Sequence, residues 1–191
     1  INGVVVGMPV KDTIKVINEK GLIEFTPKRS TLYLAQTPQV FRGDILIDAY
    51  EKGMKALEEG DILFAVKNFN LAENIFPQSG WAPKTIIMSA YAYYSQDYYG
   101  DAIYEIERYL AKHPDGEYES YAYYLMGLSY YESIIDEKKD IKPILKSKKY
   151  FHYLKVNYPD SDFVIDANYK IILIENLLAS KELYIAKYYL Q

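Results

Sequence analysis

The sequence contains no cysteine, and its 191 residues include two histidines and one tryptophan. Without cysteine it can form no disulfide, thiolate metal site, cysteine nucleophile or lipid-bearing cysteine. The two histidines, His113 and His152, lack the spacing of a zinc site, so we expect neither to be a ligand or a base. We therefore expect no catalytic residue, metal or cofactor.

Long apolar runs are also lacking. No stretch approaches the roughly 18 apolar residues that span a bilayer. The first residues show neither the basic nor the apolar region of an export signal. The chain starts with Ile1 and ends in mid-pattern at Gln191, which suggests a fragment at both ends. Its net charge of −4 gives no general attraction for nucleic acid.

The composition is that of a folded protein, half hydrophobic and a quarter charged, but it changes along the chain. Of 22 tyrosines, only Tyr33 and Tyr50 precede residue 91. Residues 1–43 carry six Lys/Arg against three Asp/Glu, whereas residues 44–191 carry sixteen against twenty-three. These two regimes predict two units, a β-arm at 1–43 and a second unit at 44–191.

The first unit shows strand and turn patterns. Apolar and polar residues alternate with period two over residues 13–17, and Gly21 marks a turn. Residues 22–25 can form the antiparallel return strand, so this segment is predicted to be a β-hairpin. We expect another strand at residues 30–35, ended by Pro38. Asp44 then suits the N-cap of a helix that reaches about Glu59.

Three motifs in this unit carry a resemblance: Pro9–Lys15, Thr26–Ser30 and Ala35–Arg42. In this order they resemble the middle of the methylerythritol-phosphate cytidylyltransferases of isoprenoid synthesis. The resemblance implies an arm that reaches across a homodimer, with Thr13 and Arg29 contacting the substrate phosphate of the partner subunit. The nucleotide-binding Gly-rich loop of that family has no counterpart here. The alternative is that both residues are inert on the surface of a severed arm.

The second unit repeats with a period near 37. The pattern Ala65-x3-Phe69-x2-Ala72-x4-Pro77 recurs as Ala102-x3-Ile106-x2-Tyr109-x4-Pro114, and a third copy ends at Pro159. Eight extra residues in the third copy fit a charged loop at 134–142. This resembles the tetratricopeptide pattern, in which helical hairpins stack as a right-handed solenoid and each proline ends a second helix. We predict a mainly α fold with repeats at about 46–79, 83–116 and 120–161, and a partial one at 162–191.

A stripe along each first helix faces the inner side of such a solenoid. Its tyrosines combine ring area with hydroxyl groups, which suits the binding of extended peptides. The alternative is that tyrosines pack between helices, which we expect for Tyr93, Tyr99, Tyr104, Tyr109 and Tyr130. The predicted groove consists of Tyr50, Met54, Leu57, Lys84, Ile87, Tyr91, Tyr94, Tyr121, Tyr124, Leu128 and Tyr131.

Residues 50–190 also resemble the BamD family of outer-membrane assembly lipoproteins. The resemblance rests on Gly53–Asp61, Phe76–Pro83, Tyr98–Ile103 with Glu107–Tyr109, Tyr121–Leu125 and Lys181–Tyr189. It implies a scaffold at the periplasmic face of the outer membrane that receives peptides of unfolded barrel proteins and docks barrel-assembly subunits. The lipid-bearing cysteine of that family is missing, and the later repeats are missing too, which leaves docking to the barrel subunit open.

Other charged groups suggest no chemistry. The acidic groups Glu58-Glu59-x-Asp61 and Asp136–Asp140 lack calcium-loop spacing and are expected to be solvated. The lysines 146, 148 and 149 are expected on one wet helix face or against an acidic partner. The sequence thus predicts a non-catalytic scaffold made by joining two unlike pieces. The alternative is a fragment of a cytidylyltransferase.

Overall fold

The computed structural model describes residues 3–41, 43–134 and 140–189. The chain divides into two compact units, residues 1–45 and 46–191. The division falls in the first turn of helix α1, which spans Gly43–Glu58. Each unit is described by itself.

The N-terminal unit contains a long antiparallel strand pair. Strand β1 (Gly3–Pro9) pairs with β4 (Tyr33–Phe41), and the register shifts between Val5 and Gly7. The prediction that Pro38 ends the strand expected at residues 30–35 is wrong, because β4 includes Pro38. Val5 pairs with Gln39 and Gly7 with Ala35, so Pro38 lies where the ladder is irregular. A residue without an N–H is tolerated at such a place.

The predicted β-hairpin is present but shorter than expected. Strand β2 (Val16–Ile17) pairs with β3 (Ile23–Phe25) in antiparallel fashion. Gly21 has φ +76°, and the Asn18 side chain accepts hydrogen bonds from the backbone N–H groups of Lys20 and Leu22. Residues 29–31 form a 3-10 turn, so the strand predicted from Ser30 begins only at Tyr33.

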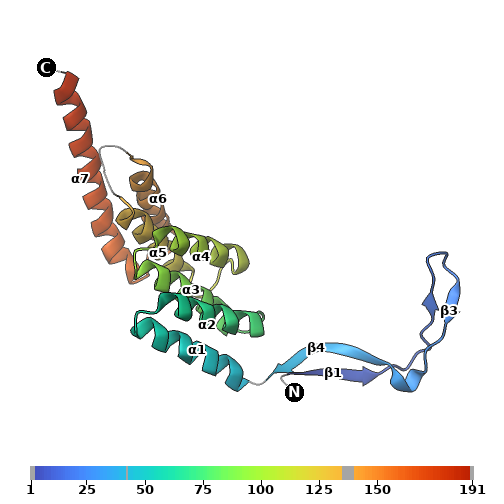
Figure 1. The fold of residues 1–191 in the computed structure, drawn as a ribbon. Helices are drawn as coiled ribbons and strands as arrows, with labels where there is room; N and C mark the ends of the chain where they lie inside the picture. The colour runs from blue at the N-terminus through green and yellow to red at the C-terminus, as the bar shows by residue number, and fades with distance from the viewer. Residues whose placement is uncertain (1–2, 42, 135–139, 190–191) are drawn as a thin grey trace. The chain divides into compact units, whose positions relative to one another are not determined.

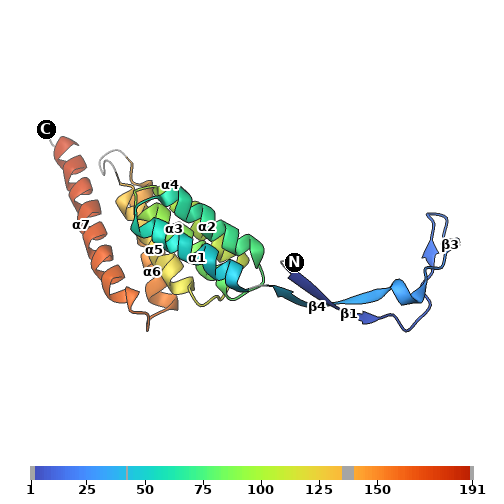
Figure 2. The same cartoon turned by 60° about the horizontal axis from the view of Figure 1, so that its bottom comes forward.

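The second unit is entirely helical in its described part, which confirms the predicted mainly α, tetratricopeptide-like fold. Consecutive helices from α2 to α7 pack side by side as a stack of antiparallel hairpins (Figures 1 and 2). After α1 come α2 (Ile62–Ile75), α3 (Trp81–Tyr94), α4 (Tyr99–Lys112), α5 (Glu119–Glu132), α6 (Lys142–Asn157) and α7 (Phe163–Tyr189).

The helix ends follow from local sequence. Helices α2, α4 and α6 each stop two residues before Pro77, Pro114 and Pro159, as predicted, because a residue before proline avoids the α conformation. Asp61 caps α2 by accepting a hydrogen bond from the Phe64 N–H. Asp44, the predicted N-cap of α1, lies instead within the first turn of that helix.

Small residues bring paired helices together. A Cβ on Gly53 would lie 2.6 Å from Phe69, and one on Gly127 would lie 2.5 Å from Phe151. Both rings are fully buried. In the second repeat Ala90 and Ile106, with the same spacing as Gly53 and Phe69, share one core cluster. The repeat therefore places a small residue against a large one in each hairpin.

The partial repeat predicted at residues 162–191 is a single helix, α7, in the described structure. The buried residues of α7 end at Ile174, and residues 182–189 are all exposed. The enlarged loop precedes α6, but residues 135–139, which include Asp136 and Glu137, lie outside the described residues. None of the helices described is both long and apolar enough to cross a membrane.

Candidate peptide-binding face

Four of the predicted tyrosines come together on helices α3 and α5. We call Tyr91, Tyr94, Tyr121 and Tyr124 the tyrosine face. Helix α3 lies beside α5, and α5 beside α7, so residues 30 or more positions apart are neighbours. Tyr91 is 39% exposed, and the other three are half-buried.

Helix α7 supports this face from one side. The rings of Tyr121 and Tyr124 lie 5.2 and 5.0 Å from the ring of Phe163, which orients both tyrosines. The Tyr124 hydroxyl donates a 2.8 Å hydrogen bond to Asp166 Oδ2. One ring and one carboxylate of α7 thus position Tyr121 and Tyr124 before any ligand arrives.

Three phenols of this face, those of Tyr94, Tyr121 and Tyr124, stay protonated. Burial raises the pKa of Tyr121 to about 12. Burial and the hydrogen bond to Asp166 raise the pKa of Tyr124 further still. Burial also raises the pKa of Tyr94, and the charges of Glu132, Asp97 and Asp166 add to that effect. At neutral pH these hydroxyls are therefore neutral hydrogen-bonding groups.

Farther along α5, two predicted groove residues serve mainly as packing. Leu128 and Tyr131 lie against the core formed by α6 and α7. The Lys170 ammonium stands 4.4 Å above the Tyr131 ring and 3.7 Å from Glu132 Oε1. The outer end of the stripe is thus occupied by the chain's own lysine.

At the other end of the stripe, α1 meets α3. The Tyr50 ring lies 5.2 Å from the Trp81 ring, and Lys84 Nζ is 5.0 and 5.1 Å from the two ring centres. Met54 and Leu57 are half-buried against the core around Phe69. The α1–α3 end of the stripe therefore carries a positive charge, that of Lys84, which lies over the rings of Tyr50 and Trp81.

Two expectations about individual side chains are wrong. Ile87 was predicted to line the groove, but it is 4% exposed and belongs to the core with Ile86 and Ala90. The reason is that α3 contacts α2, α4 and α5 and is covered on most sides. Tyr104 was expected to pack between helices, but it is 65% exposed.

The other tyrosines expected to pack do contact neighbouring rings. Tyr109 is fully buried, and its hydroxyl accepts a hydrogen bond from the Tyr118 N–H. The three remaining ones are half-buried in pairs: Tyr93 with Tyr98, Tyr99 with Tyr94, and Tyr130 with Tyr150.

In the N-terminal unit, the two residues suggested as phosphate contacts are both exposed. Arg29 lines a hollow with Pro9, Val10, Lys11 and Ser30, and its Nη1 donates a 3.1 Å hydrogen bond to the Lys11 carbonyl oxygen. Thr13 is not among the residues that line this hollow. The phosphate contact suggested for Thr13 and Arg29 stays a prediction.

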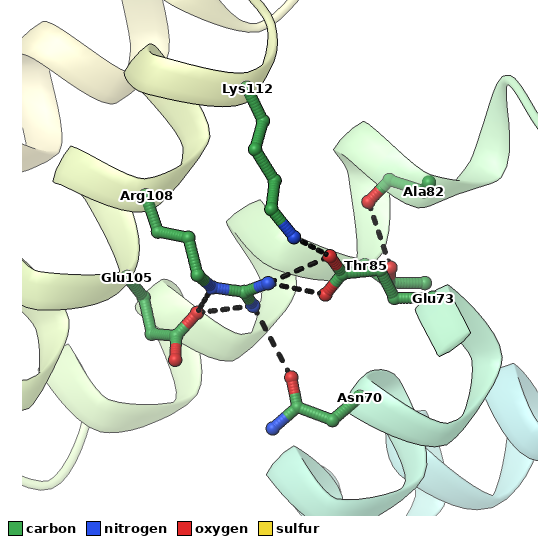
Figure 3. Close-up of polar contacts among 7 residues, drawn as sticks. All are labelled: Asn70, Glu73, Ala82, Thr85, Glu105, Arg108 and Lys112. Carbon is green, nitrogen blue, oxygen red and sulfur yellow. Dashed lines mark hydrogen bonds and ion pairs between the residues drawn. The ribbon is translucent and has the colours of Figure 1, made fainter. Parts of the chain in front are cut away.

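A charged network between α2 and α4 escaped the sequence analysis. Arg108 donates to both carboxylate oxygens of Glu73, at 2.7 and 2.6 Å, and to Glu105 Oε2 at 2.8 and 2.6 Å (Figure 3). Lys112 Nζ lies 2.8 Å from Glu73 Oε1, and Asn70 accepts a weaker bond from Arg108. We call Glu73, Glu105, Arg108 and Lys112 the arginine network.

This network links two hairpins through buried charge. Burial acts to raise the pKa of Glu73, but the hydrogen bonds and charges of Arg108 and Lys112 outweigh it and hold the pKa below its ordinary value. Only the Glu105–Arg108 pair, three residues apart, could have been seen in the sequence. Glu73 lies 35 residues before Arg108 in the sequence, and no sequence pattern predicts that the two would pair.

The histidines and the lysine group, for which the sequence suggested no chemistry, contact neighbouring side chains or lie exposed on the surface. His113 caps α4, with its ring 5.7 Å from that of Tyr109, and His152 is exposed. The described residues contain no cluster of His, Cys, Asp and Glu that could hold a metal ion. The lysine group is divided among three partners: Lys146 lies on Tyr130, Lys148 pairs with Glu175, and Lys149 lies on Tyr150.

Two family models match the chain, one over the helical unit and one over a stretch that includes the N-terminal unit. The family model for the outer membrane lipoprotein YfiO matches residues 46–191. The family model for 2-C-methyl-D-erythritol 4-phosphate cytidylyltransferase, IspD, matches residues 1–77. The two matches overlap over residues 46–77.

Individual relatives agree with this division. Outer membrane protein assembly factor BamD of Caulobacter vibrioides is 30% identical over 142 residues, which cover 74% of this chain and 47% of that protein. The Rickettsia prowazekii factor is also 30% identical, over 57% of its length. The chain thus spans about half the length of these relatives. The cytidylyltransferase of Clostridioides difficile is 52% identical over 52 residues, which cover 27% of this chain and 22% of that enzyme.

Solved structures show the same fold at low identity. The first tetratricopeptide domain of human RPAP3 has a TM-score of 0.55 and 18% identity, covering 74% of this chain and 98% of that domain. A structure of the first such repeat domain of Spaghetti (RPAP3) with an HSP90 peptide has a TM-score of 0.54 and 17% identity, covering 72% of this chain and 96% of that one. These likenesses concern the fold alone.

Proposed function

Because the chain belongs to the YfiO family of outer membrane lipoproteins, we propose that it is a non-catalytic scaffold for outer-membrane protein assembly. In this proposal the helical unit, residues 44–191, binds extended peptides of unfolded outer-membrane proteins. Its place would be the periplasmic face of the outer membrane, and its other partners would be barrel-assembly subunits. Residues 1–43 would be an arm with no part in peptide binding.

The observation that carries the proposal is the tyrosine face. Phe163 orients the rings of Tyr121 and Tyr124, and Asp166 holds the Tyr124 hydroxyl, so these two side chains have little entropy left to lose on binding. Tyr91 leaves more than a third of its surface exposed beside these oriented rings. Aromatic rings give contact area to apolar peptide side chains, and hydroxyls can bond an extended backbone.

Substitutions on this face test the proposal. We expect Tyr91→Ala to weaken the binding of a Phe-ended barrel-protein peptide about tenfold, the loss of one central aromatic contact. Tyr124→Phe keeps the ring but removes the hydroxyl, so its effect should be smaller. Tyr104→Ala is the control, because it removes an equally large ring from an exposed site on α4.

Peptide affinity is measured by fluorescence anisotropy and folding by circular dichroism. If Tyr91→Ala binds like Tyr104→Ala, with all proteins fully helical, the tyrosine face is not the binding surface.

A second candidate function rests on the N-terminal match. Residues 1–77 match the cytidylyltransferase family, and the Clostridioides difficile enzyme shares 52% identity over 52 residues. We propose that this part is a piece of the enzyme without turnover, because the Gly-rich nucleotide loop is not found in the sequence. An assay with CTP and methylerythritol phosphate tests this. Turnover above a no-protein control would make the chain an enzyme.

A further inference from the structure

Three carboxylates lie near the tyrosine face, those of Asp97, Glu132 and Asp166. Asp166 accepts the Tyr124 hydroxyl at 2.8 Å, and Asp97, at the turn after α3, accepts the Tyr99 hydroxyl at 2.7 Å. Glu132, at the end of α5, also acts on the Tyr94 phenol. Among the described residues, one ammonium group is paired with these carboxylates: Lys170 Nζ lies 3.7 Å from Glu132 Oε1.

From this arrangement we infer that the tyrosine face selects peptides that carry a lysine or arginine next to their aromatic residues. The cation would lie on the rings of Tyr91 and Tyr94, with Asp97 and Asp166 as its counter-charges. This inference rests on the proposed peptide-binding function and adds a charge preference to it.

The chain's own Lys170 shows that such a pairing forms here. Its ammonium stands over the Tyr131 ring at 4.4 Å and beside Glu132 at 3.7 Å, so one ring and one carboxylate hold one cation. On α3 the Tyr94 ring lies 5.9 Å from the Tyr99 ring, whose hydroxyl bonds Asp97, and the charges of Asp97 and Asp166 act on the Tyr94 phenol. A cation over a tyrosine ring gains more when partly desolvated, as in a half-buried groove.

The opposite end of the stripe has the opposite charge. There Lys84 lies on Tyr50 and Trp81, and among the described residues it forms no ion pair with a carboxylate. A peptide cation would therefore be repelled at the α1–α3 end and attracted at the α5–α7 end. The charge difference thus also gives a bound peptide a preferred direction.

The experiment compares three synthetic peptides of about ten residues, a length that spans a helical groove in extended form. They share two phenylalanines and differ at one adjacent position, which is Lys, Gln or Glu. We expect the Lys peptide to bind the full chain about three- to tenfold more tightly than the Gln peptide, and the Glu peptide to bind most weakly. Raising the salt from about 0.1 M to 1 M should reduce these differences.

The matched variants remove charge without changing shape. In Asp97→Asn with Asp166→Asn, both side chains can still accept their tyrosine hydrogen bonds, and asparagine tolerates the positive φ of 64° at position 97. We expect this pair to abolish the Lys preference. The control pair is Glu107→Gln with Glu182→Gln, two exposed sites. Glu182 is about 24 Å along α7 from Asp166.

The outcomes separate the two proposals. Equal binding of all three peptides, or a Lys preference that survives Asp97→Asn with Asp166→Asn, overturns the charge inference and leaves peptide binding intact. If none of the three peptides binds, the proposed function is overturned and the inference with it.

Discussion

Single glycines set the distance between the helices of a hairpin. Gly127 leaves room for the Phe151 ring, and Gly53 does the same for Phe69. Because both rings are fully buried, neither can swing into solvent to make space. The packing of these two hairpins therefore depends on one missing methyl group in each.

A methyl group at position 127 should accordingly destabilise the protein. Gly127→Ala places a Cβ 2.5 Å from Phe151, and we expect a loss of about 1–3 kcal/mol in the free energy of unfolding, the cost of overpacking a core. Urea denaturation followed by circular dichroism measures it.

The control for this change is Gly100→Ala. Position 100 is also helical, and a Cβ there meets nothing within 4 Å. Alanine should leave stability unchanged or raise it by up to about 1 kcal/mol. If the two variants were equally stable, the ring of Phe151 would have to move freely.

At the scale of elements, α2 and α4 are joined by charge as well as by packing. The arginine network places two nearly buried carboxylates around one guanidinium, with side-chain exposures of 7% for Glu73, 9% for Glu105 and 20% for Arg108. The planar guanidinium makes two hydrogen bonds to each carboxylate, four in all, which the three donors of an ammonium cannot supply. The second hairpin is thereby held on the first.

Removal of the guanidinium should therefore loosen these hairpins. We expect Arg108→Met to lower the free energy of unfolding at pH 7 by about 2–3 kcal/mol, because two buried carboxylates lose their main partner while Lys112 remains. Arg108→Lys keeps the charge and should lose less. Thermal unfolding of the three proteins measures the effect, and a stable Arg108→Met would show that the network adds nothing.

The same network makes stability depend on pH. The pKa of Glu73 is lowered in the folded state, so its contribution is complete above the ordinary value of 4.5 and disappears as the pH falls through the lowered pKa. In Arg108→Met one of the two partners that lower this pKa is gone and Lys112 remains, so this loss of stability should be smaller. Denaturation midpoints between about pH 3 and 7 test the difference.

At the scale of the whole molecule, the two units differ in how much they bury. The N-terminal unit has two-stranded sheets, and Ile17, Ile23 and Phe25 are all more than half exposed. The helical unit contains four clusters of buried apolar residues. Two-stranded sheets are marginal in water without further packing.

Amide exchange should therefore distinguish the units. We expect residues 1–40 to exchange faster than residues 60–180, because the strands open locally while the helical core opens only with larger unfolding. Hydrogen–deuterium exchange of proteolytic peptides measures this on the full chain. Equal protection of the two segments would contradict it.

The sequence alone determined the helical repeat and where the second helix of each repeat ends. The 37-residue period and the prolines after α2, α4 and α6 were readable, because they act through local geometry and fixed spacing. The compositional change and the quoted motifs likewise pointed to two families.

Only the tertiary structure decided which side chains are buried and which meet. Ile87 and Tyr91 lie on one predicted stripe, yet one is in the core and the other on the surface, since neighbouring helices cover α3 unevenly. Pro38 is accommodated by an irregular strand pair, and Glu73 finds Arg108 across two helices. These outcomes depend on contacts between segments far apart in sequence, where periodicity carries no information.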